Sequence, residues 1–438
     1  PEVEFILGDK ERFKDVNKLL SKYAEKMSES ERIFLNIFSL FRTEVTGNDF
    51  TGVFRHEIED TKFNDVLANM SELDFRDLID GLVDWRLISY DETKKSYATH
   101  PLIKGYFESD FDEKIKKLCH KRIYQYFGEY APEQPETLED MQPLFEQVYH
   151  GCAAGLYDEV LDAVFWNRIQ RENEYFITHK LGAWETALSL VKTFFPKGDL
   201  SQMPLVSEKG IQGWLLATAG LALLNTGRPK EAEEAFLTVL QVNIEEKGWE
   251  NVSVDYQNLA ELQFQTGELV SGLESAKKAL DAAEKAKSDR DITNSKAYLA
   301  WILHLLGKSE EADNWFRRAD ELRIKIDPDG NRLYSIYGIF YADFLTLMKR
   351  IDEALELIKQ NLEICQMNNW QVITSECHRC LGAIERIKGN HNEAEIHLQN
   401  AIEIVRRLGM PFFEIEALLE SDRLHLDMKR HEEAIRDA

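Results

Sequence analysis

The second half of the sequence repeats with a period of about 40 residues, and this repeat constrains the fold more than any other feature. Aligning the units on a shared turn residue gives steps of 40, 40, 42, 40 and 40 residues. The turn residues are Gly227, Gly267, Gly307, Lys349, Gly389 and Lys429. A repeat of this length predicts helix pairs that cannot bury their apolar faces alone and must stack on their neighbours.

Small residues recur at two fixed distances from each turn, and a bulky residue recurs at a third. Small side chains at both points would let the two helices of a pair cross closely, and the bulky one would fill the space between pairs. Five residues after the turns stand Ala232, Gly272, Ala312, Ala354, Ala394 and Ala434; seven before them stand Gly220, Ala260, Ala300, Ala342, Gly382 and the exception Asp422; nine after most of them stand Phe236, Phe316, Ile358 and Leu398.

With the acidic residue that precedes the small one, these positions form a G-x-x-x-E-A turn. The pattern resembles tetratricopeptide repeats, lengthened from the usual unit of about 34 residues. We therefore expect a mostly α-helical protein, with a right-handed α-α superhelix of such repeats over residues 211–438. Residues 131–210 are interpreted as a linker, with three prolines in 131–143, followed by divergent helical repeats.

Residues 1–130 follow a different pattern. A capping box at Ser28 and Glu31 opens an apolar helix, and two shorter helices are expected at 62–69 and 71–85. The segment 85–100 reads as two alternating strands joined by a polar turn, and a further helix begins after it. Three helices followed by a β-hairpin is the order of a winged-helix domain, which we expect here.

The charge distribution argues against a nucleic-acid reader. The chain carries a formal charge of -25, and most of the excess lies after residue 130, so cationic partners should approach the repeats fastest. The expected second helix of the helix–turn–helix, 71–85, holds five acidic residues against one arginine, Arg76. Because DNA binding requires phosphate charge to be neutralised, Lys94 and Lys95 on the wing are too little to compensate. A packing and regulatory role is favoured, without nucleic-acid or membrane partners.

The stretch 28–109, ending in YATHPLIKGYF, resembles the winged-helix domain of STAND-class NTPases of the NB-ARC (AP-ATPase) type. The resemblance implies that His100, after the second wing strand, contacts the bound ADP phosphates in the intact protein. Pro101 replaces the usual aspartate of that motif, a variant similar to bacterial members. The nucleotide-binding core is absent from this chain, so no cofactor is expected in it, and ADP or ATP is expected only with that missing domain.

Motifs for catalysis are not found in the sequence. Gly307, Lys308 and Ser309 imitate the end of a phosphate-binding loop, but Ile302 stands where its first glycine is required. Cys377 and Cys380 have a metal-like or redox-like spacing, yet packing on a repeat helix explains them more simply. The cysteine count is odd and no signal peptide is visible, so we expect reduced thiols in a cytoplasmic, non-enzymatic protein. Because the chain opens on Pro1 in mid-pattern, we expect a fragment or a processed product.

The first helix of each repeat is expected to line a concave face that binds a protein or peptide. Three hypotheses about the setting stay open: the sensor and regulatory part of a bacterial STAND NTPase, with anti-phage defence as one setting; a stand-alone scaffold or adaptor; and the sensor end of a STAND-type transcription activator that binds a small molecule. Residues six, nine, ten and thirteen positions before a turn usually point into such a face. The residues expected there, most of them at these offsets, are Asn258, Glu261, Asn294, Tyr298, Trp301, Asp343, Arg379 and Arg386.

Overall fold

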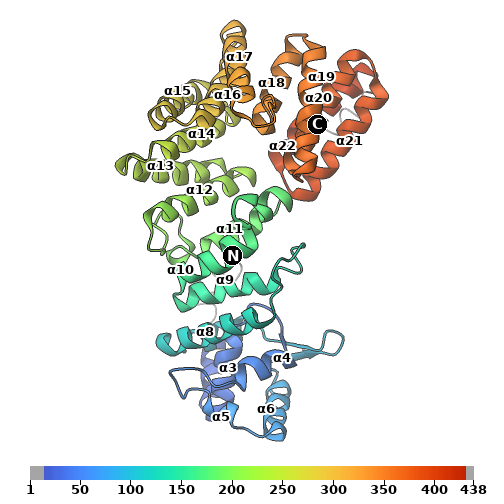
Figure 1. Ribbon diagram of the computed structural model, residues 1–438. Coiled ribbons are helices and arrows are strands. Elements are labelled where there is room, and N and C mark those ends of the chain that lie inside the picture. The colour runs from blue at the N-terminus through green and yellow to red at the C-terminus, as the bar shows by residue number, and fades with distance from the viewer. Residues whose placement is uncertain (1–13, 431–438) are drawn as a thin grey trace. The chain divides into compact units, whose positions relative to one another are not determined.

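The computed structural model describes residues 14–430, and the chain divides into two compact units that meet between Ile169 and Gln170 (Figure 1). Unit 1 therefore contains the proline-bearing segment 131–141, which has no regular helix, and the helix that follows it, α9 (Gln142–Ala154). Helix α9 packs against α8 (Glu113–Tyr130).

Unit 1 combines helices with a small antiparallel sheet. Helix α3 begins after Ser28, whose side chain accepts from the Glu31 backbone N–H while the Glu31 carboxylate accepts from the Ser28 N–H, so the predicted capping box is confirmed. Its apolar face packs into a core of phenylalanine rings. Besides α8 and α9, the helices in this part of the chain are α2 (Lys14–Ala24), α3 (Glu29–Leu40), α4 (Gly47–Asp49), η1 (Phe50–Phe54), α5 (Asp65–Ala68), α6 (Glu72–Asp84), α7 (Pro101–Ser109), α10 (Tyr157–Val160) and η2 (Leu161–Gln170).

The sheet of unit 1 has three short strands in the order β1-β3-β2. Strands β2 (Ser89–Asp91) and β3 (Ser96–Ala98) form the hairpin predicted over 85–100. Strand β1 (Val45–Thr46), which pairs with β3, was not predicted, because two residues are too few to show alternation. On the wing, Lys94 binds Glu44 across 2.7 Å, so one of its two lysines is already paired with a carboxylate.

Unit 2 is a curved stack of helix pairs, as the period predicts (Figure 1). Each first helix contacts its own second helix and also the first helix of the next pair. The first helices therefore lie on the inner side of the curve. Before the pairs stand η3 (Glu172–Glu174), η4 (Phe176–Lys180), α11 (Trp184–Lys192) and η5 (Pro196–Gly198); the pairs are α12 (Lys209–Asn225) with α13 (Pro229–Glu245), α14 (Trp249–Gln265) with α15 (Leu269–Ala286), α16 (Asp289–Leu305) with α17 (Ser309–Ile326), α18 (Ser335–Leu347) with α19 (Ile351–Met367), and α20 (Gln371–Lys388) with α21 (His391–Leu408), followed by α22 (Pro411–Asp427).

All six predicted turn residues adopt left-handed backbone conformations. The φ angles of the four glycines lie between 78° and 84°, and those of Lys349 and Lys429 are both 60°. At each turn the next residue donates its N–H to a carbonyl five residues back, over 2.7–2.9 Å, which ends the first helix in the same way every time. The predicted phase of the repeat is therefore confirmed by the backbone itself.

The glycines at the two predicted small-residue positions differ in how closely a neighbouring helix approaches them. A Cβ atom at Gly382 would lie 2.6 Å from Cγ of the buried Leu398, and one at Gly220 would lie 2.5 Å from the ring of Phe236. At Gly272 the nearest atoms would be 3.5 Å away, an ordinary contact. Ala434, which completes the predicted series, lies outside the described residues.

We expect Gly382→Ala to destabilise unit 2 by about 1–3 kcal/mol, because the buried Leu398 must move to admit the new methyl group. Gly272→Ala is the matched control and should be neutral or stabilise by up to about 1 kcal/mol, since alanine lowers the entropy cost of the helix. Thermal and urea unfolding of the two variants measure the difference. Equal losses in both would contradict the assignment of close helix crossing to Gly382.

The single 42-residue step corresponds to a longer connection between α17 and α18. Asp320 accepts from the Leu333 backbone N–H at 2.8 Å and from Nε of Arg332 at 2.8 Å. Asn361 accepts from the Ser335 N–H and donates to the Ser335 carbonyl. These contacts hold the connection against the helices on either side of it and fix the start of α18.

The curvature of unit 2 brings its first and last elements into contact. A Cβ atom at Gly182, just before α11, would lie 2.3 Å from Cδ2 of Leu408 at the end of α21. Likewise, η4 contacts α20. The inner side of the stack is thus enclosed by elements from both ends of unit 2. Among the described residues, no helix is both long and apolar enough to cross a membrane.

Candidate functional site: two adjoining cavities inside the repeat array

Two cavities lie on the inner side of unit 2, with volumes of about 400 and 440 Å³. They share Glu261, Ile336 and Phe413, so they adjoin each other. We name the first the aromatic cavity and the second the acidic cavity. The aromatic cavity also touches Asn173, Glu174, Tyr175, His179, Trp184, Leu221, Asn225, Ser335, Trp370, Val372 and Ile373; the acidic cavity also touches Phe264, Gln265, Trp301, Leu305, Ile339, Phe340, Asp343, Glu376, Arg379, Phe412, Ile415 and Glu416.

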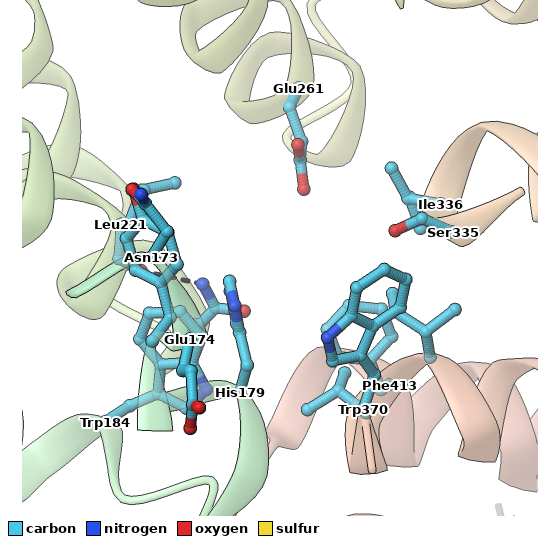
Figure 2. Close-up of a pocket in the computed structure, with 14 residues that line it drawn as sticks. Asn173, Glu174, His179, Trp184, Leu221, Glu261, Ser335, Ile336, Trp370 and Phe413 are labelled. Carbon is cyan, nitrogen blue, oxygen red and sulfur yellow. Dashed lines mark hydrogen bonds between the residues drawn. The ribbon is translucent and has the colours of Figure 1, made fainter. Parts of the chain in front are cut away.

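The aromatic cavity lies between the two ends of the array. Figure 2 shows Trp184 and Leu221 on one side and Trp370 and Phe413 on the other, with Glu261 pointing toward the space between them. Trp184 is 7% exposed, and its Nε1 has no hydrogen-bond acceptor among the described residues. Burying a donor without an acceptor is costly, so this group is suited to a ligand carbonyl.

The acidic cavity combines aromatic walls with carboxylates. Trp301 stacks on Phe340 with ring centroids 5.3 Å apart and an interplanar angle of 8°, which fixes the indole in place. Glu261 accepts the hydroxyl hydrogen of Tyr298 at 2.5 Å and a weaker bond from Gln265 at 3.3 Å. Burial raises the pKa of Glu261, and the Tyr298 hydroxyl partly opposes that rise.

The guanidinium of Arg379 lies within 4 Å of three carboxylates, which come from three helices. Arg379 on α20 lies 2.6 Å from Asp343 on α18, 2.7 Å from Glu376 on its own helix and 3.9 Å from Glu416 on α22. Burial raises the pKa of Glu376 to about 8 despite this guanidinium, and it raises the pKa of Glu416 as well. The cluster therefore holds more acidic groups than its single cation can neutralise.

The structure gathers four of the eight predicted concave-face residues at the acidic cavity: Glu261, Trp301, Asp343 and Arg379. The other four lie elsewhere. Tyr298 and Asn258 are buried, at 4% and 8% exposure, and the Tyr298 hydroxyl donates a hydrogen bond to Glu261. Asn294 accepts a hydrogen bond from Arg323, and Arg386 pairs with Glu420 and Asp427.

Several residues that line these cavities were not among those predicted for the concave face. Ile336, Glu376 and Glu416 each stand thirteen residues before a turn, which is one of the offsets expected for the concave face. The rule was therefore sufficient to find them. Trp184 and Trp370 lie outside the phased positions, and only the closure of the array brings them together.

His100 occupies the position preceding helix α7 in unit 1. Its Nδ1 accepts the backbone N–H of Leu102 at 3.2 Å and so caps the helix. The ring is exposed. Because Nδ1 accepts, the neutral ring carries its hydrogen on Nε2, which is left as a donor.

The cysteine pair is placed for packing. Cys377 and Cys380 are both buried, and burial raises the pKa of each thiol well above its ordinary value, which disfavours the reactive thiolate. Within residues 14–430, no group of three or more His, Cys, Asp or Glu side chains is arranged to hold a metal ion.

No protein-family model matches this sequence, and no curated protein matches it. Among solved structures, the chain is similar to a signal transduction ATPase with numerous domains (STAND) protein with a tetratricopeptide repeat sensor from Pyrococcus horikoshii, at 11% identity and a TM-score of 0.46. That match covers 96% of this chain, which spans 58% of the length of the archaeal protein. A Rap protein complexed with competence and sporulation factor is similar at 10% identity and a TM-score of 0.41, over 92% of this chain and 99% of the other.

Proposed function

We propose that this chain is a non-catalytic sensor whose repeat array binds a segment of a trigger protein or a peptide in the two inner cavities. Unit 1 acts as a winged-helix relay to a nucleotide-binding domain of STAND type that is not part of this sequence. Bacterial defence against phage is one setting that suits such a device.

The observation that carries the proposal is the enclosure of the cavities by both ends of the array. Trp184 precedes the first phased repeat, whereas Phe413 belongs to the last described helix, and both line the aromatic cavity. A ligand held there contacts early and late repeats at once. Because a solenoid bends by small rotations at each repeat interface, such a ligand stabilises one curvature over others. Binding is thereby converted into a change of shape.

The relay role of unit 1 is supported by its strand order and by His100. Order β1-β3-β2, with α6 immediately before the hairpin, is consistent with a winged helix. His100 keeps Nε2 as an exposed donor, which suits a phosphate oxygen of a nucleotide held by the missing domain. In the intact protein, His100→Ala removes that contact.

The site is tested by filling the aromatic cavity. Leu221→Trp places an indole in the cavity, whereas Leu237→Trp makes the same change on the exposed surface of α13. Twelve-residue peptides selected from a displayed random library on the immobilised 438-residue chain serve as probes. We expect Leu221→Trp to weaken the selected peptides at least 10-fold in fluorescence anisotropy, because the indole excludes them, and Leu237→Trp to leave them unchanged.

Two results would overturn the assignment of the binding site. One is the same affinity in both tryptophan variants, which would place the peptides elsewhere on the chain. The other is a library that yields no binder on the folded chain, confirmed as folded by circular dichroism.

A further inference from the structure

Within the proposed sensor, and resting on that function, we propose that the acidic cavity is a cation subsite. It takes the guanidinium or ammonium group of an arginine or lysine in the bound segment, while an apolar side chain beside it enters the aromatic cavity. The segment recognised is thus a basic residue next to an aromatic or aliphatic one.

The first argument is the charge of the lining. Four carboxylates, those of Glu261, Asp343, Glu376 and Glu416, face this cavity, and Arg379 is the single base among its lining residues. The other lining residues are uncharged. Arg379 is already held by Asp343 and Glu376, at 2.6 and 2.7 Å. A second cation would find acceptors in the cavity, whereas an anion would meet repulsion at short range.

The second argument is that acceptor atoms at the cavity have no donor. Glu376 is 1% exposed, and among the described residues no N–H group or hydroxyl donates to its Oε1; its carboxyl shares a hydrogen bond only with the carboxyl of Glu416 and with Arg379. Oε1 of Gln265 is likewise buried without a donor. Glu261 is bonded to a hydroxyl and an amide, with no cation within salt-bridge distance among the described residues. A guanidinium with five N–H groups matches several converging acceptors of this kind.

The third argument is the aromatic lining beside the carboxylates. Trp301, Phe264 and Phe413 line the same cavity. Aromatic faces attract cations through the ring quadrupole, and guanidinium stacks on them as a flat group. Arginine is therefore expected to bind more tightly than lysine.

The protonation of the cluster supports this inference. Burial raises the pKa of Glu376 to about 8, so in the empty cavity this carboxyl is largely neutral at pH 7. The charged groups around it are Asp343 on α18, Arg379 on α20 and Glu416 on α22. An entering cation favours the carboxylate and expels the proton. Affinity for a cationic segment should therefore rise as the pH is raised from about 6.5 to 8.5.

The experiment compares matched peptides on matched variants. Probes are the library-selected peptides with their basic residue as arginine, lysine or the uncharged isostere citrulline. The protein is the full chain, the double variant Glu261→Gln/Glu416→Gln, and the control Glu274→Gln, whose side chain lies on the exposed surface of α15. We expect arginine peptides to bind roughly 10–100-fold more tightly than citrulline peptides. That preference should shrink to a few-fold in the double variant and persist in the control.

The outcomes separate this inference from the proposed function. If citrulline and arginine peptides bind equally, yet both are lost with Leu221→Trp, the cation subsite is wrong and the binding site stands. Equal weakening of both peptides by the double variant would also overturn the subsite. If the selected peptides bind the Leu221→Trp variant as tightly as the unchanged chain, the proposed function itself is wrong.

Discussion

Replacing Arg379 by methionine is expected to destabilise unit 2 by about 3–5 kcal/mol at pH 9.5. The guanidinium is 11% exposed and lies within 2.7 Å of both Asp343 and Glu376. Methionine keeps the apolar stem but leaves these carboxylates in the interior without a counter-charge. Urea unfolding followed by tryptophan fluorescence measures the loss.

The pH dependence distinguishes lost charge from lost packing. At pH 5.5 the buried carboxyl of Glu376, whose pKa is raised to about 8, is neutral in either protein, so the loss caused by Arg379→Met should be smaller. Arg406→Met is the control, because Arg406 is 58% exposed and pairs at the surface with Glu414 at 2.7 Å. That exposed pair should contribute no more than about 1 kcal/mol. A loss of the same size at both pH values would mean that packing, not charge, explains the effect.

Asp255→Asn is expected to stabilise the array by about 2–4 kcal/mol at pH 8.5 and by a smaller amount, about 1–2 kcal/mol, at pH 5. Asp255 on α14 is 3% exposed, and its Oδ2 accepts a hydrogen bond from Nδ2 of Asn243 at 2.6 Å. Burial raises its pKa from 3.8 to about 7, against the opposing hydrogen bond. A raised pKa means that the folded state favours the neutral acid. The stability that this group gives is therefore complete below about pH 4 and is lost as the pH rises through about 7.

Asparagine mimics the neutral acid at every pH, so the variant should remove this part of the pH dependence. Thermal unfolding at pH 5, 7 and 8.5 measures it, with Asp281→Asn as control. Asp281 is exposed and pairs with Lys285, so its replacement should change stability by no more than about 0.5 kcal/mol. An Asp255→Asn protein that follows the wild-type pH profile would contradict the burial argument.

The periodic features of unit 2 could be predicted because each depends on a few neighbouring residues. The six predicted turn residues all adopt a left-handed conformation, even Lys349 and Lys429, where the side chain makes it unfavourable. Close helix crossing at Gly220 and Gly382 follows from the same phase. In unit 1, the capping box and the hairpin were likewise visible as local patterns, whereas the two-residue strand β1 was not.

Four of the eight residues predicted for the concave face line the acidic cavity and four do not, and the geometry explains the difference. Offsets from the turn identify which side of a helix a residue is on. They do not say whether a neighbouring helix covers it, and thus Tyr298 and Asn258 are buried whereas Glu261 and Trp301 line a cavity. The rule also included Glu376 and Glu416, whose importance appears only when Arg379 is seen between them.

The sequence by itself determined that this protein is a helical-repeat array behind a smaller mixed domain, where each turn falls, and that the array is strongly acidic. The tertiary structure decided that the array closes far enough for Gly182 to meet Leu408, and so for Trp184 and Phe413 to line one cavity. The physical reason is that curvature is a sum of small rotations at many repeat interfaces. No single repeat contains that sum, so contacts between residues more than two hundred positions apart could not be read from the period.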